Sequence, residues 1–322
     1  MPQPTHLSYL GLAREVTRGV PAAATDFLPV QTMTPHDDLK YFPDQGMRGS
    51  MVTQYDNIAG ARFATYSLGG DVYPDIFGFL LAAMLGDVTT TGAAAPFTHA
   101  MSVLNAGDGQ PPSLTLTDYD GVNARQFPGM IPSDLSVKFT ADGLLSYTAA
   151  LTGFGSSLAA APVRSFSAVP PIANWRGTAT VGGAADVTVI DGGCDIKRAI
   201  DVIQNVDGSQ QPYRIWGGPV TVSGTLTVVS ESVAGTPDSH LGQFLAGTAT
   251  TLVLDWLNAG TELRLAMSKT TYTVANVQRG KAYVEVALTY EANANAIDIG
   301  GSGGYSPIKG IIQSAKAAGS YR

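Results

Sequence analysis

Residues 220–228 read Val-Thr-Val-Ser-Gly-Thr-Leu-Thr-Val, so apolar or small residues alternate with hydroxyl residues. This period of two predicts a half-buried β-strand. A short helix is expected after it, because Thr236 can act as N-cap, Pro237 can take the first helical position and Gly247 can end the helix. Further strands are expected over residues 251–257, 262–267 and 281–290. The stretch 218–292 therefore predicts one short helix packed on antiparallel strands.

The first half of the chain predicts the same order of elements. Residues 57–68 predict a strand, and Pro74-Asp75 opens a helix that Gly86 ends, just as Pro237-Asp238 opens the other helix. Residues 142–152 resemble residues 279–289 in the style of a last strand. The sequence therefore predicts a tandem duplication.

Matched positions extend this interpretation along both halves. Gly60 is matched with Gly224, and Asp38-Leu39-Lys40 with Asp195-Ile196-Lys197. The spacing between matched positions shrinks toward the end of each copy, which indicates an insertion in the Gly-, Ala- and Thr-rich segment 89–109. We expect an N-terminal arm at 1–27, a first copy at 28–154, a linker at 155–176, a second copy at 177–299 and a C-terminal arm at 300–322.

Composition limits the class of protein. The 322 residues include 37 Gly and 19 Pro but only 14% charged residues, a balance typical of β-rich chains with many turns. The formal net charge of −7 argues against a protein that grips nucleic acid. The single cysteine, Cys194, excludes an intramolecular disulfide. Neither a signal peptide nor an apolar run long enough to cross a membrane is expected.

Two long polar segments occupy corresponding places in the copies. Residues 34–50 and 197–211 are rich in Pro, Gly, Asn and Asp, and both are expected to be long loops. Long structureless connections are usually functional, so both are candidate functional segments. Residues 300–304 predict a flexible hinge before a tail with three isoleucines, which would need a surface on which to dock.

No catalytic, cofactor-binding or metal-binding residues are expected. The four histidines lack metal-site spacing, and they are His6, His36, His99 and His240. Residues 118–123 resemble a calcium loop but lack its Gly at position six and its closing Glu. The three tryptophans, Trp175, Trp216 and Trp256, could form a sugar-binding platform. An extracellular β-sandwich module for carbohydrate binding or adhesion therefore stays open as an alternative.

Several dispersed motifs carry a family resemblance, and they are residues 9–15, 19–22, 27–30, 74–75, 111–114 and 292–295. In these motifs and in the order of its elements, the chain resembles the tail tube (major tail) proteins of long-tailed bacteriophages. The resemblance implies a mainly β fold, with two tandem β-sandwich or half-barrel units, each flanked by a short α-helix. It also implies that the units complete a barrel by oligomerisation. An acidic wall would suit such a conduit, because it repels phosphate.

The resemblance further implies a structural virion protein, not an enzyme, located in the tail and assembled in the host cytoplasm. Stacked rings would form a hollow tube through which DNA is ejected. Each ring would be a homotrimer with pseudo-sixfold symmetry, or a hexamer. Other partners would be the tape measure protein and genomic DNA in the lumen, and the tail terminator and distal tail proteins at the ends, with no membrane. The candidate lumen strands are residues 57–68 with 134–140 and 220–229 with 262–269. Segments 34–50 and 197–211 resemble the family's stacking loops.

Overall fold

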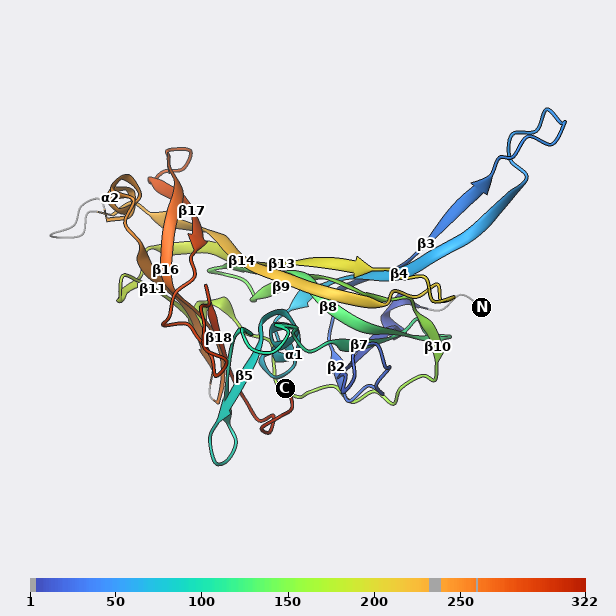
Figure 1. The fold of residues 1–322 in the computed structure, drawn as a ribbon. Coiled ribbons are helices and arrows are strands. Elements are labelled where there is room, and N and C mark those ends of the chain that lie inside the picture. Colours follow the sequence, from blue (N-terminus) through green and yellow to red (C-terminus); the bar gives the residue numbers. More distant parts are fainter. Residues whose placement is uncertain (1–3, 232–238, 259) are drawn as a thin grey trace.

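Figure 1 shows a computed structural model that describes residues 4–231, 239–258 and 260–322. The predicted mainly β fold is confirmed. The first half contains β1 (Tyr9–Arg14), β2 (Asp26–Leu28), β3 (Thr32–Asp44), β4 (Asp56–Asp71), α1 (Pro74–Leu85), β5 (Gly86–Thr91), β6 (Phe97–Val103), β7 (Leu114–Tyr119), β8 (Ala124–Thr140), β9 (Ser146–Phe154) and β10 (Ser157–Ala159). The second half contains β11 (Gly177–Val181), β12 (Ala184–Asp186), β13 (Val189–Ile203), β14 (Arg214–Val229), α2 (Ser239–Ala246), β15 (Thr250–Asn258), β16 (Thr261–Gln278), β17 (Glu285–Ala292) and β18 (Lys309–Ser314).

Eight of these strands form one antiparallel sheet in the order β3-β4-β9-β8-β13-β14-β17-β16, which we call the eight-stranded sheet. Its middle lies between β8 and β13, where the first half of the chain pairs with the second. It extends across the upper part of the molecule in Figure 1. One face is apolar, because Leu68, Leu135, Ile196 and Val222 are buried along one row that crosses the strands.

Two smaller sheets continue from bends in β8 and β16. The first side sheet has the order β2-β1-β7-β8-β10 and uses the N-terminal part of β8. The second side sheet has the order β12-β11-β15-β16-β18-β6-β5 and uses the N-terminal part of β16. Each bent strand therefore belongs to two layers, which close around a shared core.

The strand pairings repeat in the two halves. The order β3-β4-β9-β8 in the first half matches β13-β14-β17-β16 in the second, and β2-β1-β7 matches β12-β11-β15. Three register shifts recur at matching places: after Leu39 and Arg198, after Pro132 and Tyr272, and after Leu114 and Thr250. Shared bulges at shared positions are a strong mark of common origin, and they support the duplication.

These bulges correct the matched positions. Gly60 lies in the same bulge as Gly218, whereas Gly224 corresponds to Tyr66. Asp38 corresponds to Lys197, not to Asp195, since each lies one residue before the last paired residue ahead of the shared bulge, Leu39 and Arg198 respectively. The sequence match was wrong because short glycine and Asp-containing patterns recur every few residues in such strands.

Residues 1–27 and 300–322, expected to be arms, both contribute strands. β1 lies between β2 and β7, where Leu10 and Leu12 are buried. β18 lies between β16 and β6, so the C-terminal tail docks on the chain's own body. The segment 89–109, expected to be an insertion, contains β6, which receives β18. The alternating apolar residues at both ends of the chain are therefore buried against strands of the same chain.

The two predicted long loops are largely β-hairpins. β3 runs to Asp44 and β13 to Ile203, so only residues 45–55 and 204–213 lie between paired strands. Pro35 and Pro43 favoured a loop, but among the residues that the structure describes β3 pairs with β4 alone, and a strand at the edge of a sheet tolerates proline. The predicted start of α2 at Thr236, Pro237 and Asp238 lies outside the described residues, and Gly247 follows α2 with a positive φ.

Helix α1 is the centre of the core. All of its residues from Pro74 to Leu85 are buried, which suits a helix that is apolar all round. Gly86 ends it with φ of 97°, a conformation that favours glycine. A side chain at Gly78 would meet the ring of Tyr321 at 2.7 Å, so the glycine lets the C-terminus pack against the helix.

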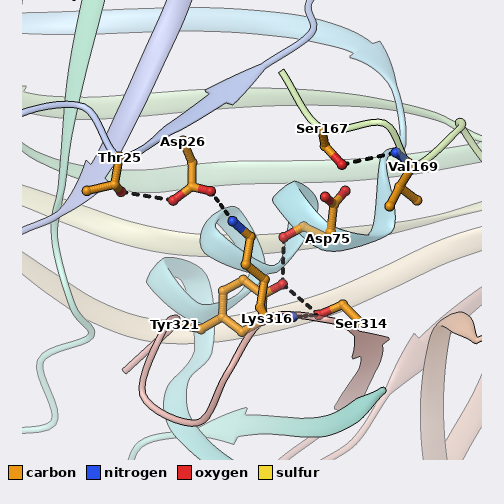
Figure 2. A network of polar contacts seen from close by, with 8 residues as sticks. All are labelled: Thr25, Asp26, Asp75, Ser167, Val169, Ser314, Lys316 and Tyr321. Atoms are coloured by element: carbon orange, nitrogen blue, oxygen red, sulfur yellow. Dashed lines mark hydrogen bonds and ion pairs between the residues drawn. The ribbon is translucent and has the colours of Figure 1, made fainter. Parts of the chain in front are cut away.

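Figure 2 shows the polar contacts that hold the C-terminal end against α1. The Tyr321 hydroxyl donates to the Asp75 carbonyl at 2.6 Å and lies 3.2 Å from Ser314 Oγ. Lys316 forms an ion pair with Asp26, which also accepts a hydrogen bond from Thr25. Beside this cluster, the Val169 amide donates to Ser167 Oγ. The last residues therefore bind both α1 and the start of β2.

Candidate assembly interface

The outer face of the eight-stranded sheet is polar. Directly paired residues share a face, and the register places a few apolar residues on this face, among them Phe63, Ala150, Val274 and Ala287, and a larger number of polar ones. The polar side chains on this face include Thr32, Thr34, His36, Asp38, Thr65, Ser67, Asp71, Asp134, Ser136, Lys138, Ser146, Thr148, Thr152, Asp191, Asp195, Lys197, Thr221, Ser223, Thr225, Asn276, Thr289 and Glu291. Hydroxyl residues dominate, and carboxylates outnumber lysines. The predicted lumen strands 57–68, 134–140 and 220–229 all contribute to this sheet.

The fourth predicted lumen strand, residues 262–269, precedes the part of β16 that belongs to the eight-stranded sheet. Residues 262–266 pair with β15 and β18 in the second side sheet, whereas residues 270–278 pair with β17. The sequence prediction missed the continuation to Gln278, because residues 268–278 are mainly polar and exposed.

The β8–β13 contact, which we call the internal joint, joins the two halves through seven residue pairs. They run from Asp134 opposite Lys197 to Thr140 opposite Asp191. The Lys197 Nζ lies 3.9 Å from Asp134 Oδ2. Burial raises the pKa of the Asp134 carboxyl, and the nearby Lys197 opposes this shift. Ser136 Oγ also donates a hydrogen bond to Asp195 across the joint.

The apolar side of the internal joint is buried in the core. Val137, Cys194 and Ile196 are buried there. Burial raises the pKa of the Cys194 thiol to about 12. A thiol with such a pKa is protonated at neutral pH and unreactive, so Cys194 acts as a packing residue.

The two outer edges of the eight-stranded sheet carry no partner strand in the described part of the chain. β3 pairs only with β4. On β16, Thr270 pairs with both β15 and β17, and residues 271–278 pair only with β17. Nearly all residues of β3 are exposed, and so are Val274 and Val277 on β16. Long unpaired edges bind other strands unless they are protected, so these edges are the candidate assembly interface.

Both halves also extend a hairpin past the end of the sheet. β9 stops opposite Phe63, so β3 and β4 continue as a two-stranded ribbon that projects from the body (Figure 1). Its apolar residues Tyr41, Phe42 and Ile58 are exposed, and Met47 and Met51 at its tip are fully exposed. Such a projecting apolar surface marks a contact site.

The equivalent β13–β14 hairpin instead lies against the first half of the chain. The Arg62 amide donates to the Gln210 carbonyl at 2.7 Å, and the Gly155 amide donates to Gln211 Oε1 at 2.8 Å. Gln110 bonds the backbone of Gly217 through both its amide oxygen and its amide nitrogen, each at 2.9 Å. The hairpin is thus held by backbone and side-chain hydrogen bonds.

Arg198 fixes this hairpin to α1, and sequence reasoning did not identify it. Its Nε donates to the Met84 carbonyl at 2.9 Å, and its guanidinium also reaches the carbonyls of Leu85 and Gly218. These contacts satisfy carbonyls at the C-terminal end of α1, where a cation is favourable. Burial lowers the pKa of Arg198 to about 10, and the charge of Arg18 adds to this effect. The only sequence signal was a lone arginine in an otherwise apolar alternation.

His99, His240 and Asp118, considered above as metal ligands, each have a separate structural role. His99 is buried between Thr90 Oγ1 and the Lys316 carbonyl, and His240 pairs with Asp186 at 2.8 Å. Burial lowers the pKa of His99. Asp118 accepts a hydrogen bond from Tyr66 at 2.8 Å. Within residues 4–231, 239–258 and 260–322, no group of three or more His, Cys, Asp or Glu could hold a metal ion.

The tryptophans do not form one exposed strip. Trp256 is buried against Phe139, Trp216 is half-buried on β14, and Trp175 is exposed. Trp175 and Trp256 line a cavity of about 240 Å³ together with Asn174. No helix in the described ranges has the length and apolar character needed to cross a membrane.

Two equivalent β units, a shared eight-stranded sheet and two open edges define a structural β protein. A family profile described as "Phage tail tube protein" matches residues 5–305, nearly the whole chain. The chain therefore belongs to the phage tail tube protein family, and it is a structural protein of the virion tail. This confirms the resemblance noted in the sequence, and it implies that the chain assembles with itself into a tube. The search of curated proteins found no significant match.

Proposed function

We propose that three copies of this chain form each ring of the tail tube and that DNA leaves the virion through the lumen. The observation that carries this proposal is the eight-stranded sheet, which holds two equivalent sets of four strands and is open at both edges. Joining the edges of neighbouring copies closes a barrel and removes both exposed edges of the eight-stranded sheet. With two sets per copy, three copies give the pseudo-sixfold ring.

The size of the closed barrel favours three copies. Three eight-stranded sheets supply 24 strands, and a spacing of about 4.8 Å with a tilt of about 40° gives a barrel about 48 Å in diameter. Side chains take up about 5 Å on each side, so the lumen is about 38 Å wide. Duplex DNA is about 20 Å wide, given its groove depths. Two copies would leave a lumen of about 22 Å, which is too tight for hydrated DNA, and six copies would roughly double the barrel.

The polar face suits a surface along which DNA moves. In this arrangement the hydroxyl-rich face points into the lumen, and the apolar face is already covered by α1 and the side sheets. Carboxylates such as Asp134, Asp191 and Asp195 repel phosphate, which prevents tight binding. Before ejection the lumen would hold the tape measure protein, and the tail terminator and distal tail proteins would close the two ends.

Electron microscopy of the purified protein tests this proposal. Hollow tubes whose cross-section averages to threefold symmetry, with six similar lobes, would support it. True sixfold symmetry with six copies per ring would contradict the trimer. A monodisperse globular protein at all concentrations, with a ligand-binding surface, would instead favour an extracellular binding module.

A further inference from the structure

We propose that the internal joint is the template for the contact between neighbouring copies. In this contact β3 of one copy pairs antiparallel with residues 274–278 of β16 in the next copy, with His36 opposite Asn276. The inference rests on the proposed ring and specifies its register. The partner is a second copy of this chain, and the pairing is named residue by residue.

The argument starts from structural equivalence. β13 and β3 occupy the same position in their halves, and the bulges after Arg198 and Leu39 align them. β8 and β16 are equivalent in the same way, through the bulges after Pro132 and Tyr272. The internal joint pairs β8 with β13. Its equivalent would pair β16 with β3, and those are the two strands with open edges.

The register of the internal joint transfers with one ladder hydrogen bond fewer, because Pro35, the equivalent of Cys194, has no N–H to donate across to Val277. Ser136 lies opposite Asp195, and these residues correspond to Asn276 and His36. Two further pairs lie on the same face. The equivalent of the Lys138–Gly193 pair is Gln278 opposite Thr34. The equivalent of the Asp134–Lys197 pair is Val274 opposite Asp38. None of these pairs sets like charges against each other. A slip by one residue would turn the polar row of β3 toward the core, so the register is strongly determined.

Burial supports this contact independently. Val137 in the internal joint is 1% exposed, whereas its equivalent Val277 at the outer edge is 37% exposed. Cys194 and Ile196 on β13 are buried, whereas their equivalents Pro35 and Asp37 on β3 are exposed. A partner strand at each outer edge would cover these residues as the internal joint covers theirs.

The projecting hairpin agrees with the same arrangement. The β13–β14 hairpin lies over the first half of its own chain, where Ile200 and Trp216 are half-buried. Their equivalents on the β3–β4 hairpin, Tyr41 and Ile58, are 56% and 57% exposed. In the proposed contact this hairpin lies over the second half of the next copy. The exposed apolar residues are then covered inside the ring.

Disulfide trapping tests the register. The double variant His36→Cys with Asn276→Cys places two thiols at directly opposed positions, where Cα atoms lie about 4.5–5.5 Å apart, within the range for a disulfide. Mild oxidation of assembled protein should convert most monomer into dimers and closed covalent trimers on non-reducing gels. The matched control, His36→Cys with Val274→Cys, moves one thiol by two residues to a diagonal separation of about 7–8 Å, and it should stay monomeric. The native Cys194 is buried and does not interfere.

The outcomes separate the inference from the proposed function. Efficient trapping by the first variant and not by the control supports the register. Equal or better trapping by the control overturns it. Tubes without trapping in either variant also overturn the β3–β16 contact, although the tube itself would stand. If wild-type protein forms neither rings nor tubes, the proposed function fails, and the inference fails with it.

Discussion

The hydroxyl of Tyr290 occupies the space that a side chain at Gly224 would need. Tyr290 on β17 lies directly opposite Gly224 on β14, and its hydroxyl donates to the Gly193 carbonyl at 2.9 Å. A Cβ at Gly224 would lie 2.4 Å from this hydroxyl and 2.1 Å from the Gly193 carbonyl oxygen. In the first half the equivalent of Gly224 is Tyr66. The tyrosine that fills this part of the core therefore lies on β4 in the first half and on β17 in the second.

We therefore expect Gly224→Ala to destabilise the fold by about 3 kcal/mol, because the clash is with backbone as well as side chain. Urea unfolding of unassembled protein, followed by tryptophan fluorescence, measures this change. The control is Gly242→Ala in α2, where a Cβ meets nothing within 4 Å and should stabilise by about 0.5–1 kcal/mol. An unchanged midpoint for Gly224→Ala would contradict the packing described here.

Arg198→Ala should lower the free energy of unfolding by about 3 kcal/mol, because it leaves buried carbonyls of Met84 and Leu85 without their charged donor. It should also loosen the contact between the halves, since Arg198 belongs to the second half and α1 to the first. Hydrogen exchange of the β13–β14 hairpin measures this loosening. The exposed Arg279→Ala should change stability by less than about 0.5 kcal/mol. Equal effects of both variants would show that the Arg198 contacts contribute nothing specific.

Strands that alternate and helices with clear end signals could be predicted from the sequence. The strand around 220–228, the helix at Pro74 and its end at Gly86 all lie where the pattern placed them. The strand β3 of the projecting hairpin could not be predicted, because it is polar and contains proline. Its strand character depends on pairing with β4, which a local pattern does not contain.

The candidate interface was only partly predictable for the same reason. Residues 57–68, 134–140 and 220–229 were assigned to the lumen wall, but the sequence could not show that β8 and β13 join within one chain. Arg198 and Tyr321 were missed because their partners are backbone carbonyls distant in sequence. A residue whose partner is backbone leaves no signature in the partner's sequence.

The C-terminal end should contribute to stability through Tyr321. Tyr321→Phe removes the hydrogen bond to the Asp75 carbonyl and should cost about 1 kcal/mol. Tyr321→Ala also empties a packed site against Gly78 and Phe79 and should cost about 4 kcal/mol. Thermal unfolding ranks the two variants against wild type. The exposed Tyr305→Phe is the control and should leave the melting temperature unchanged. Wild-type stability of Tyr321→Ala would mean that the C-terminal end does not pack on α1 in solution.

The Asp186–His240 contact should make stability depend on pH in acid. Burial tends to raise the pKa of Asp186, but hydrogen bonds from His240 and Thr188 outweigh it and lower the pKa from 3.8 to about 2. Because the folded pKa is depressed, the stabilisation is complete above about pH 4 and is lost as the pH falls toward 2. Asp186→Asn should therefore be less stable than wild type by about 1–2 kcal/mol at pH 5.

Urea unfolding at a series of pH values measures this difference, which should shrink between pH 4 and pH 2. The exposed Asp142→Asn serves as the control and should follow the wild-type profile. A gap between wild type and Asp186→Asn that stays constant down to pH 2 would show that Asp186 is not held ionised by these partners.

The tip of the β3–β4 hairpin should connect adjacent rings. In a barrel the strands tilt by about 40° from the axis, so a hairpin that continues past the sheet also advances along the axis and leaves its own ring. Replacing residues 45–55 with Asn-Gly closes the ribbon between the paired residues Asp44 and Asp56 with a two-residue turn.

We expect this variant to fold and to form rings but no long tubes, and we expect Met47→Ser with Met51→Ser to shorten tubes, because both methionines are fully exposed at the tip. Tube lengths in electron micrographs measure both effects. Val163→Ser with Val187→Ser removes two similarly exposed apolar residues elsewhere and should leave tube length unchanged. Wild-type tube lengths in the shortened variant would mean that the rings stack through another surface, and loss of rings as well would mean that the tip acts within the ring.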